Sequence, residues 1–340
     1  MSEHRRSPEN GARQSPGKPA DLPKSSKMKV LKRTVDQIKE DELTDRAAAL
    51  TYYGVQAMFP GILVLVSILG LLGHSTTQSL ISNLGQIAPG SAKSFIQTVI
   101  TNSQKNKSVA GIAGIVGIVL ALWSASAYVA AFMRSANAIY GIGEGRPIWK
   151  TAPVRLGVTL FMVIGLVVGL VIVVVSGPVA TQIGNLVGVG STAVTVWNIA
   201  KWPVLLIIFV VMLAVLYKAS PNVKTGGSKW ISPGAVLAVV IWLVASALFA
   251  FYVANFGSYN KTYGALAGVI IFLVWLWISN LAILLGAEFN AELEHERALH
   301  EGVSSDSEHF AVAKDTRKLD DKPAREAERT EAIRGRSRKN

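Results

Sequence analysis

The chain has 340 residues, of which half are hydrophobic and 16% are charged, and its formal net charge is +12. Soluble domains usually carry about 25% charged residues, so this composition disfavours a soluble enzyme. Of the 22 acidic residues, 8 lie in residues 1–45 and 13 lie from Glu288 onward, which leaves Glu144 between them. So long a stretch with one carboxylate is typical of an integral membrane domain. The absence of cysteine excludes disulfides, thiolate catalysis and Cys-ligated metals.

The N-terminal segment, residues 1–25, is rich in Ser, Pro, Lys and Arg and is predicted to be disordered in the cytoplasm. No apolar run follows it at the distance expected of a signal peptide. Apolar residues then recur at steps of three and four beside lysines: Met28, Leu31, Val35 and Ile38. This pattern predicts a basic amphipathic juxtamembrane helix over residues 26–46, which either lies on an anionic leaflet or leads, solvated, into the first span.

Residues 47–290 are predicted to form an all-α, polytopic membrane bundle of six transmembrane helices. Each apolar stretch has roughly 20 or more residues, the length that crosses a hydrocarbon core about 30 Å thick. The predicted spans are approximately 47–73, 109–139, 153–177, 199–219, 231–254 and 263–287. Pro153, Pro203 and Pro233 stand where a helix can begin without losing a hydrogen bond, and Ser232 is a candidate N-cap.

Basic residues near the span ends predict the orientation of the bundle. Fifteen of them, from Lys24 to Arg297, collect on one side, and five lie on the other: Lys93, Lys105, Lys107, Lys201 and Lys261. The positive-inside rule then places both termini in the cytoplasm. Because the basicity belongs to the membrane domain, we expect membrane lipids as partners, anionic at the cytoplasmic face, and no nucleic acid. A homo-oligomer is left open.

Two connecting segments stand apart from the spans. Residues 74–108 contain two short amphipathic segments broken near Pro89, which either rest on the bilayer surface or cover an external cavity. Residues 291–340 are charged and have few apolar side chains. We expect them to form a mostly disordered cytoplasmic tail.

Three blocks of the sequence resemble a known family. They are Ala-Ala-Leu-Thr-Tyr-Tyr at 48–53 with Phe-Pro at 59–60 and Leu-Gly-Leu-Leu-Gly at 69–73, Leu-Trp-Ser-Ala-Ser at 122–126 with Asn-Ala-Ile-Tyr at 137–140, and residues 259–268 with Leu-Gly-Ala-Glu-Phe-Asn at 285–290. Together they are similar, in order, to the YihY/BrkB family of bacterial inner-membrane proteins, over roughly residues 30–295. The resemblance implies an all-helical, six-span protein. It implies little chemistry, since the family's members carry names such as virulence factor and ribonuclease BN without a settled activity.

A nuclease needs carboxylates and histidines gathered around hard cations. The five histidines are His4, His74, His295, His300 and His309. Only His295, with Glu292 or Glu296 on what is expected to be a solvated helix, has ligand spacing beside a carboxylate. No membrane serine has a neighbouring His and Asp. The sequence therefore disfavours an enzyme, ribonuclease included, and predicts no catalytic residue, metal site or cofactor.

A passive or lipid-related transporter fits the composition better. Carboxylate-based ion coupling is disfavoured because no carboxylate lies well inside a span. The candidate polar groove consists of Tyr52, Tyr53, Gln56, Ser124, Ser126, Tyr128 and Asn280. The alternative for these residues is hydrogen bonding between neighbouring helices, which is common in membrane bundles. The alternative function is a structural envelope scaffold that binds anionic lipid through its basic rim.

Packing can also be predicted from the spans. The first, second and sixth spans are expected to form the core, and the third to lie outermost, although Gly165 and Gly169 could give it a contact face. Gly264 and Gly268 are predicted to form a contact face on the sixth span. Pro60 should kink the first span near Gln56.

Arg134 is predicted to be the principal buried charge. It lies five or six residues before the end of the second span, roughly 8 Å below the helix end. Its candidate partner is Glu288, with Asp45 and Glu144 as alternatives at the same rim. Snorkelling of the guanidinium to the lipid headgroups is the competing interpretation.

Overall fold

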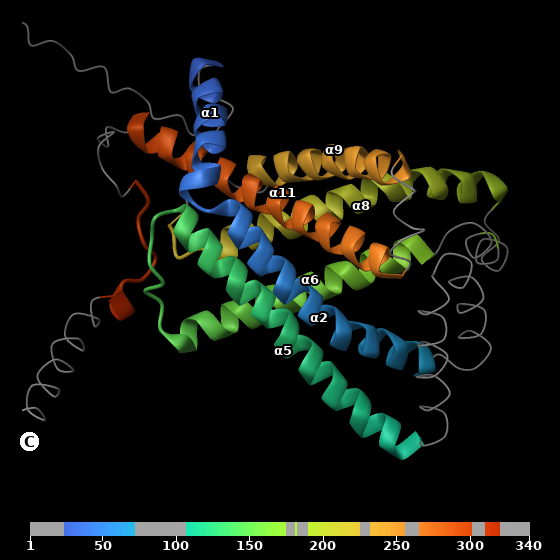
Figure 1. Cartoon of the computed structure of the whole chain (residues 1–340). Coiled ribbons are helices and arrows are strands. Elements are labelled where there is room, and N and C mark those ends of the chain that lie inside the picture. The colour runs from blue at the N-terminus through green and yellow to red at the C-terminus, as the bar shows by residue number, and fades with distance from the viewer. Residues whose placement is uncertain are drawn as a thin grey trace, which may run out of the picture.

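The computed structural model describes residues 24–71, 107–174, 181, 190–224, 232–255, 265–300 and 310–319. Its helices are α1 Lys24–Glu40, α2 Leu43–Leu71, α5 Lys107–Ile139, α6 Ile148–Val174, α8 Ser191–Ala219, α9 Pro233–Asn255 and α11 Ala265–His300 (Figure 1). Within these ranges the extended pairing is limited to one isolated bridge between Val223 and Ala313. The all-α prediction is confirmed for the described part of the chain. The predictions for residues 1–23 and 72–106 lie outside it.

Five helices of the described chain are long and apolar enough to cross a membrane. They cover Val119–Ile139, Ile148–Val173, Ser191–Ala219, Pro233–Asn255 and Ala267–His300. Helix α2 has 29 residues and contains most of the first predicted span. A multi-pass helical membrane protein is therefore confirmed, while the number of six spans and the side of the termini stay predictions.

Two of the three proline-based helix starts are wrong. Pro233 is the first residue of α9, and the Ala235 N–H donates to Ser232 Oγ at 3.3 Å, so this start and its cap are confirmed. Pro153 and Pro203 instead lie inside α6 and α8. The hydropathy pattern marks only the apolar part of a helix, whereas the polar residues before these prolines are also helical.

The helices pack in a ring in which each contacts the next, in the order α2, α5, α6, α8, α9 and α11, and α11 returns to α2. Helices α2, α5 and α11 also contact one another, so the predicted core trio is confirmed. Helix α6 exposes apolar side chains along most of its length. Its Gly165 nevertheless approaches Met212 of α8, so α6 does not face lipid all round.

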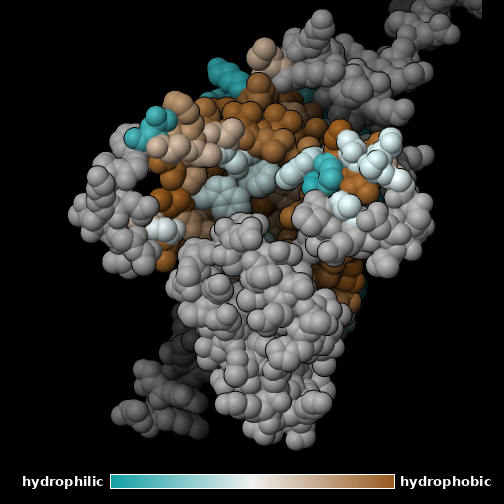
Figure 2. All heavy atoms as spheres, turned by 90° about the vertical axis from the view of Figure 1, so that its right-hand side faces the viewer, coloured by the Kyte–Doolittle hydropathy of each residue, from teal (hydrophilic) through white to brown (hydrophobic). Residues whose placement is uncertain are grey.

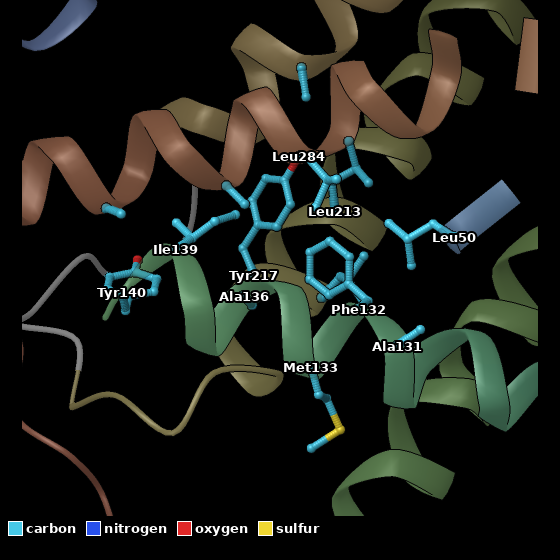
Figure 3. Close-up of a cluster of buried hydrophobic side chains, with 14 of the residues drawn as sticks. Leu50, Ala131, Phe132, Met133, Ala136, Ile139, Tyr140, Leu213, Tyr217 and Leu284 are labelled. Atoms are coloured by element: carbon cyan, nitrogen blue, oxygen red, sulfur yellow. The ribbon is translucent and has the colours of Figure 1, made fainter. Parts of the chain in front are cut away.

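The core lies at the end of the bundle that is expected to be cytoplasmic (Figure 3). Leu50, Phe132, Leu213, Tyr217 and Leu284 are buried there, and the rings of Phe132 and Tyr217 stack with centroids 6.0 Å apart. In Figure 1, α2 and α5 diverge from α8 and α9 toward the opposite end. The bundle is thus closed at one end and spread at the other.

Helices α9 and α11 cross with almost no space between their backbones. A Cβ atom at Gly234 would collide with the Gly286 carbonyl oxygen, and one at Gly286 would collide with the Gly234 carbonyl. Small residues permit such close approach between membrane helices. Among the described residues nothing lies within 4 Å of a Cβ at Gly268, and Gly264, the other residue of the contact face predicted there, lies outside them. The close approach that the structure shows on this helix is at Gly286.

Figure 1 shows α2 changing direction in its middle, the region of the sequence that contains Pro60. A proline removes one backbone hydrogen bond and clashes with the preceding turn, which accounts for a bend there. The side chains of 59–71 lie outside the described residues. Gln56, the residue predicted to sit at the kink, is exposed.

Helix α11 continues to His300, well past the predicted span end at 287, and α1 packs across this extension. Val30 is buried against Leu293, and Arg33 bridges Glu292 at 2.5 Å and Glu296 at 2.7 Å. The expectation of a mostly disordered tail from 291 therefore differs from the structure in 291–300. A polar helix can be covered here because the arginine of α1 compensates its carboxylates.

Candidate functional site

A hydrogen-bonded chain joins three helices inside the bundle. The Tyr128 hydroxyl of α5 donates to Asn280 Oδ1 of α11 at 2.8 Å, and Asn280 Nδ2 donates to Thr51 Oγ1 of α2 at 3.1 Å. Thr51 in turn donates to the Ala47 carbonyl at 2.8 Å. The structure thus brings two predicted groove residues together. It adds Thr51, which the sequence signals only as a polar residue beside Tyr52 in an apolar helix.

A second polar chain between α9 and α11 was not anticipated. The Trp242 indole donates to Ser279 Oγ at 3.0 Å, and the Trp275 indole donates to Ser246 Oγ at 3.2 Å. Ser279 also donates to the Trp275 carbonyl of its own helix at 2.8 Å. These tryptophans are apolar by hydropathy, and only the need of an indole N–H for a buried partner could have indicated the bonds.

The remaining groove candidates do not join these chains. Ser126 is buried and donates to the Trp123 carbonyl of its own helix at 2.7 Å. Ser124 is half-buried, whereas Tyr52 and Gln56 lie on the exposed face of α2. The predicted groove is therefore split between an inner hydrogen-bonded set and an outer exposed set.

The predicted ion pair between Arg134 and Glu288 is wrong. Arg134 is exposed, and its guanidinium lies 5.8 Å from the centre of the Tyr53 ring. Glu288 is 1% exposed and hydrogen-bonds the carboxyl group of Asp41 instead. The two alternative partners that the sequence offered are Asp45, which is exposed, and Glu144, and within the described chain neither pairs with Arg134. The position of Arg134 in the sequence predicted its depth along α5 correctly, but it did not predict the direction in which the side chain points around the helix axis.

The Asp41 carboxyl lies between the end of α1 and the start of α2, facing α11. Burial raises its pKa above the ordinary value, although the hydrogen bond with Glu288 and the charge of Arg46 act in the opposite direction. Glu292 adds a further negative charge to the same place. Glu288 Oε2 has no hydrogen-bond partner among the described residues. Two carboxyl groups in one hydrogen bond need a proton between them.

Glu144 is the centre of a different polar cluster, at the end of α5. The Arg146 side chain, which is 5% exposed, donates to both Glu144 oxygens at 2.8 and 2.7 Å, and Asn137 Nδ2 donates to Glu144 at 2.9 Å. Burial raises the pKa of Glu144, but these hydrogen bonds outweigh it and hold the pKa below its ordinary value. Arg146 also donates to the Ser220 carbonyl at 2.7 Å, which ties the α5–α6 loop to the end of α8.

Residues 310–319, which we term the C-terminal strap, lie across this rim. The fully buried Asn222 donates through Nδ2 to the Asp315 carbonyl at 2.8 Å, and its Oδ1 accepts from the Asp315 N–H at 3.2 Å. Hydrogen bonds from Arg317 and Lys150 hold the pKa of Asp315 well below its usual range. The expectation of disorder from 291 onward therefore also differs from the structure in 310–319.

No metal-binding arrangement is present in the part of the chain that the structure describes. His295 Nδ1 lies 3.6 Å from Glu292, but Glu292 is bound by Arg33, and the His295 ring stacks on Phe310 of the C-terminal strap at 4.5 Å. The helix that carries His295 is thus covered on two sides rather than solvated.

Figure 2 views the molecule from the end at which the helices diverge. Pale, weakly polar surface lies recessed there between hydrophobic surfaces drawn in brown. The inner hydrogen-bonded chain of Tyr128, Asn280 and Thr51 lies between this divergent end and the packed core of Figure 3.

A family model described as Virulence factor BrkB matches residues 34–309. A Bacillus subtilis protein named putative ribonuclease-like protein YfkH is 30% identical over 272 residues, which are 80% of this chain and 98% of that protein. A UPF0761 membrane protein of Aggregatibacter aphrophilus is 26% identical over 77% of this chain and 91% of its own length. One of Vibrio campbellii is 27% identical over 76% and 79%. No solved structure is significantly similar to the chain.

Proposed function

Because the chain belongs to the BrkB family of membrane proteins, we propose that it is a passive or lipid-related transporter that works without carboxylate-based ion coupling. We place its six spans in the bacterial cytoplasmic membrane, with both termini in the cytoplasm. The observation that carries the proposal is the bundle that is packed at one end, which we expect to be cytoplasmic, and spread at the other, with a hydrogen-bonded polar chain between the two (Figures 1 and 3).

The positions of the carboxylates support the absence of ion coupling. Asp41, Glu144 and Glu288 all lie at the packed end of the bundle. Asp41 and Glu288 are hydrogen-bonded to each other, and Glu144 is bound by Arg146. Coupled transporters generally place an ionisable group within a span, along the path of the ion. A path lined by hydroxyl, amide and indole groups instead suits neutral solutes or the polar part of a lipid.

The ribonuclease-like name belongs to the Bacillus relative. For the present chain we propose no enzymatic activity. The described histidines, His295 and His300, lie beside Glu292 and Glu296, and Arg33 binds both of these carboxylates. A hydrolytic mechanism would need at least one base or metal ligand that is free to reach a substrate.

A scaffold that binds anionic lipid is the second candidate function, favoured by the outer face of α1. Met28, Leu31 and Val35 are exposed on this face, and Lys29 and Lys32 are exposed beside them. An amphipathic helix with lysines flanking an apolar stripe is attracted to an anionic leaflet. Val30 meanwhile anchors α1 to α11.

Reconstitution separates the two functions. The purified protein is placed in liposomes, and movement of a fluorescent lipid between leaflets and leakage of a trapped neutral dye are followed against protein-free liposomes. The transporter predicts one or both activities, and Asn280→Leu should reduce them more than Gly268→Ala, a change on the same helix at an open position. Neither activity above the protein-free rate would reject transport and favour the scaffold.

A further inference from the structure

An exposed arginine lies within the membrane-facing surface of α5. Arg134 is five residues from the last residue of α5, Ile139, so its Cα lies about 8 Å inside the helix end. The flanking residues Met133 and Ser135 are buried, whereas Arg134 is exposed. A charge at such depth is costly unless it reaches the headgroups or finds a counter-ion. No carboxylate of the described chain pairs with it.

Helix α2 supplies the other side of this position. The Tyr53 ring lies under the Arg134 guanidinium at 5.8 Å, and the Tyr52 ring meets Tyr53 edge-on at 5.3 Å. Tyr52 is 63% exposed. A guanidinium over an aromatic face is oriented by the cation–π attraction, and its N–H groups remain free to bind an anion at the ring's edge. The arginine is therefore positioned rather than loosely extended.

The surface beyond Arg134, toward the membrane interior, is apolar. Leu120 and Trp123 are exposed on the same face of α5, with the small Ala127 and Ala130 between them and the arginine. Trp123 and Arg134 are eleven positions apart, which corresponds to about 16 Å along the helix. The face thus has a cation at headgroup depth and an apolar track at acyl-chain depth.

We propose that Arg134 and Tyr53 bind the phosphate of an anionic phospholipid of the inner leaflet, whose acyl chain lies along Ala130, Ala127 and Trp123. The guanidinium donates to the phosphate oxygens, a geometry that arginine satisfies with two parallel bonds. The site gives the lipid-related function proposed above its ligand class and rests on that function for its biological meaning. Binding can nevertheless be measured without transport.

The test uses the full chain in detergent and native mass spectrometry with added phosphatidylglycerol. Arg134→Gln is expected to weaken lipid retention by about fivefold or more, the effect of one basic residue at an anionic headgroup. Lys318→Gln is the matched control, because it removes one exposed positive charge from the C-terminal strap rather than from α5 or α2. It should change retention by less than about twofold. Tyr53→Leu should weaken retention, and Tyr53→Phe should keep most of it, since the phenyl ring supports the guanidinium.

Further experiments distinguish a lipid phosphate from free inorganic phosphate as the ligand of the site. Inorganic phosphate at millimolar concentration should not displace the lipid, because it lacks the acyl chain. Displacement by it, or equal losses in Arg134→Gln and Lys318→Gln, overturns the proposal. If Arg134→Gln does not fold, Arg134→Lys and Tyr53→Leu replace it, and unchanged retention in both rejects the site. If the wild type moves lipid between leaflets but does not retain phosphatidylglycerol, the site alone is rejected, whereas retention by the wild type without lipid movement rejects only transport.

Discussion

Asp41 and Glu288 meet in one carboxyl–carboxyl hydrogen bond where α2 begins and where α11 leaves the packed core. Glu288 is almost fully buried, and Glu292 lies near with its own negative charge. The pair therefore holds a proton in the folded protein that both groups would release when unfolded at neutral pH. This relationship links protonation at the rim to the contact between α2 and α11.

The first prediction concerns stability against pH. The folded pKa of Asp41 is raised above its ordinary 3.8. The folded state then binds more protons than the unfolded state, so stability is greatest below that ordinary value and falls as the pH rises through the folded value. Thermal unfolding, followed by tryptophan fluorescence, should show a midpoint that falls as the pH rises from this ordinary value of 3.8 toward neutrality. Glu288→Gln should flatten this fall and raise the midpoint at pH 8 by roughly 2 °C or more.

Asp45→Asn is the control for this prediction, because it removes an exposed carboxylate from the same helix start. It should leave the pH dependence nearly unchanged. Identical pH profiles for wild type and Glu288→Gln would show that the shared proton does not contribute to stability.

A second prediction uses the crossing of α9 and α11. In Gly286→Ala the new methyl group meets the Gly234 carbonyl, the Ala238 methyl group at 2.6 Å and the Tyr217 hydroxyl at 2.6 Å. We expect a loss of about 1–3 kcal/mol in the free energy of unfolding. Gly268→Ala on the same helix meets nothing within 4 Å and should be neutral or slightly stabilising. Equal behaviour of the two variants in thermal unfolding would contradict the close crossing.

A third prediction tests the inner polar chain by a double-mutant cycle. Asn280→Ala and Tyr128→Phe should each cost about 0.5–2 kcal/mol, the range of hydrogen bonds between membrane helices. The double variant should lose less than the sum, because the two side chains share one bond of 2.8 Å. Ser126→Ala removes a hydroxyl that bonds only within α5 and serves as the control. Strict additivity would place the two residues outside a common network.

A fourth prediction concerns the C-terminal strap. Asn222→Ala leaves the Asp315 N–H and carbonyl and the Gly143 carbonyl without their partner, which should cost about 1–3 kcal/mol. Trypsin should then cleave after Lys314 faster than in the wild type. Asn255→Ala, which breaks an exposed hydrogen bond at the end of α9, should leave the cleavage rate unchanged. Unchanged cleavage in Asn222→Ala would mean that other contacts hold the strap.

Hydropathy was sufficient to predict the apolar parts of the long helices, because apolar length is a property of each segment by itself. It did not predict the polar ends of α6, α8 and α11. Tyr128 and Asn280 could be singled out for the same reason, as polar groups in apolar helices. The partner of Arg134 could not be predicted in this way. A shift of one position turns a side chain by about 100° around the helix axis, so Arg134 faces outward although Met133 is buried.

Glu144 and the C-terminal strap show a second limit. Glu144 was predicted as an alternative partner of Arg134, yet it is bound by Arg146, two residues away, because the α5–α6 loop turns back on itself at Gly141, where φ is 61°. The strap is held by backbone groups that Asn222 reaches. Such contacts depend on the shape of the rim rather than on the composition of residues 310–319, so a charged segment of this kind is easily assigned to disorder.

The docking of the strap also sets an order of events during synthesis. Residues 310–319 follow every described helix in the chain, yet they complete the polar surroundings of Asn222 on a loop made much earlier. Until the ribosome has released this segment, the ends of α5 and α8 at this rim must stand hydrated, with their carbonyls bonded to water. Insertion of the helices and closure of the rim are therefore separate steps, and a ribosome stalled before residue 310 would carry a helical bundle whose rim is still open.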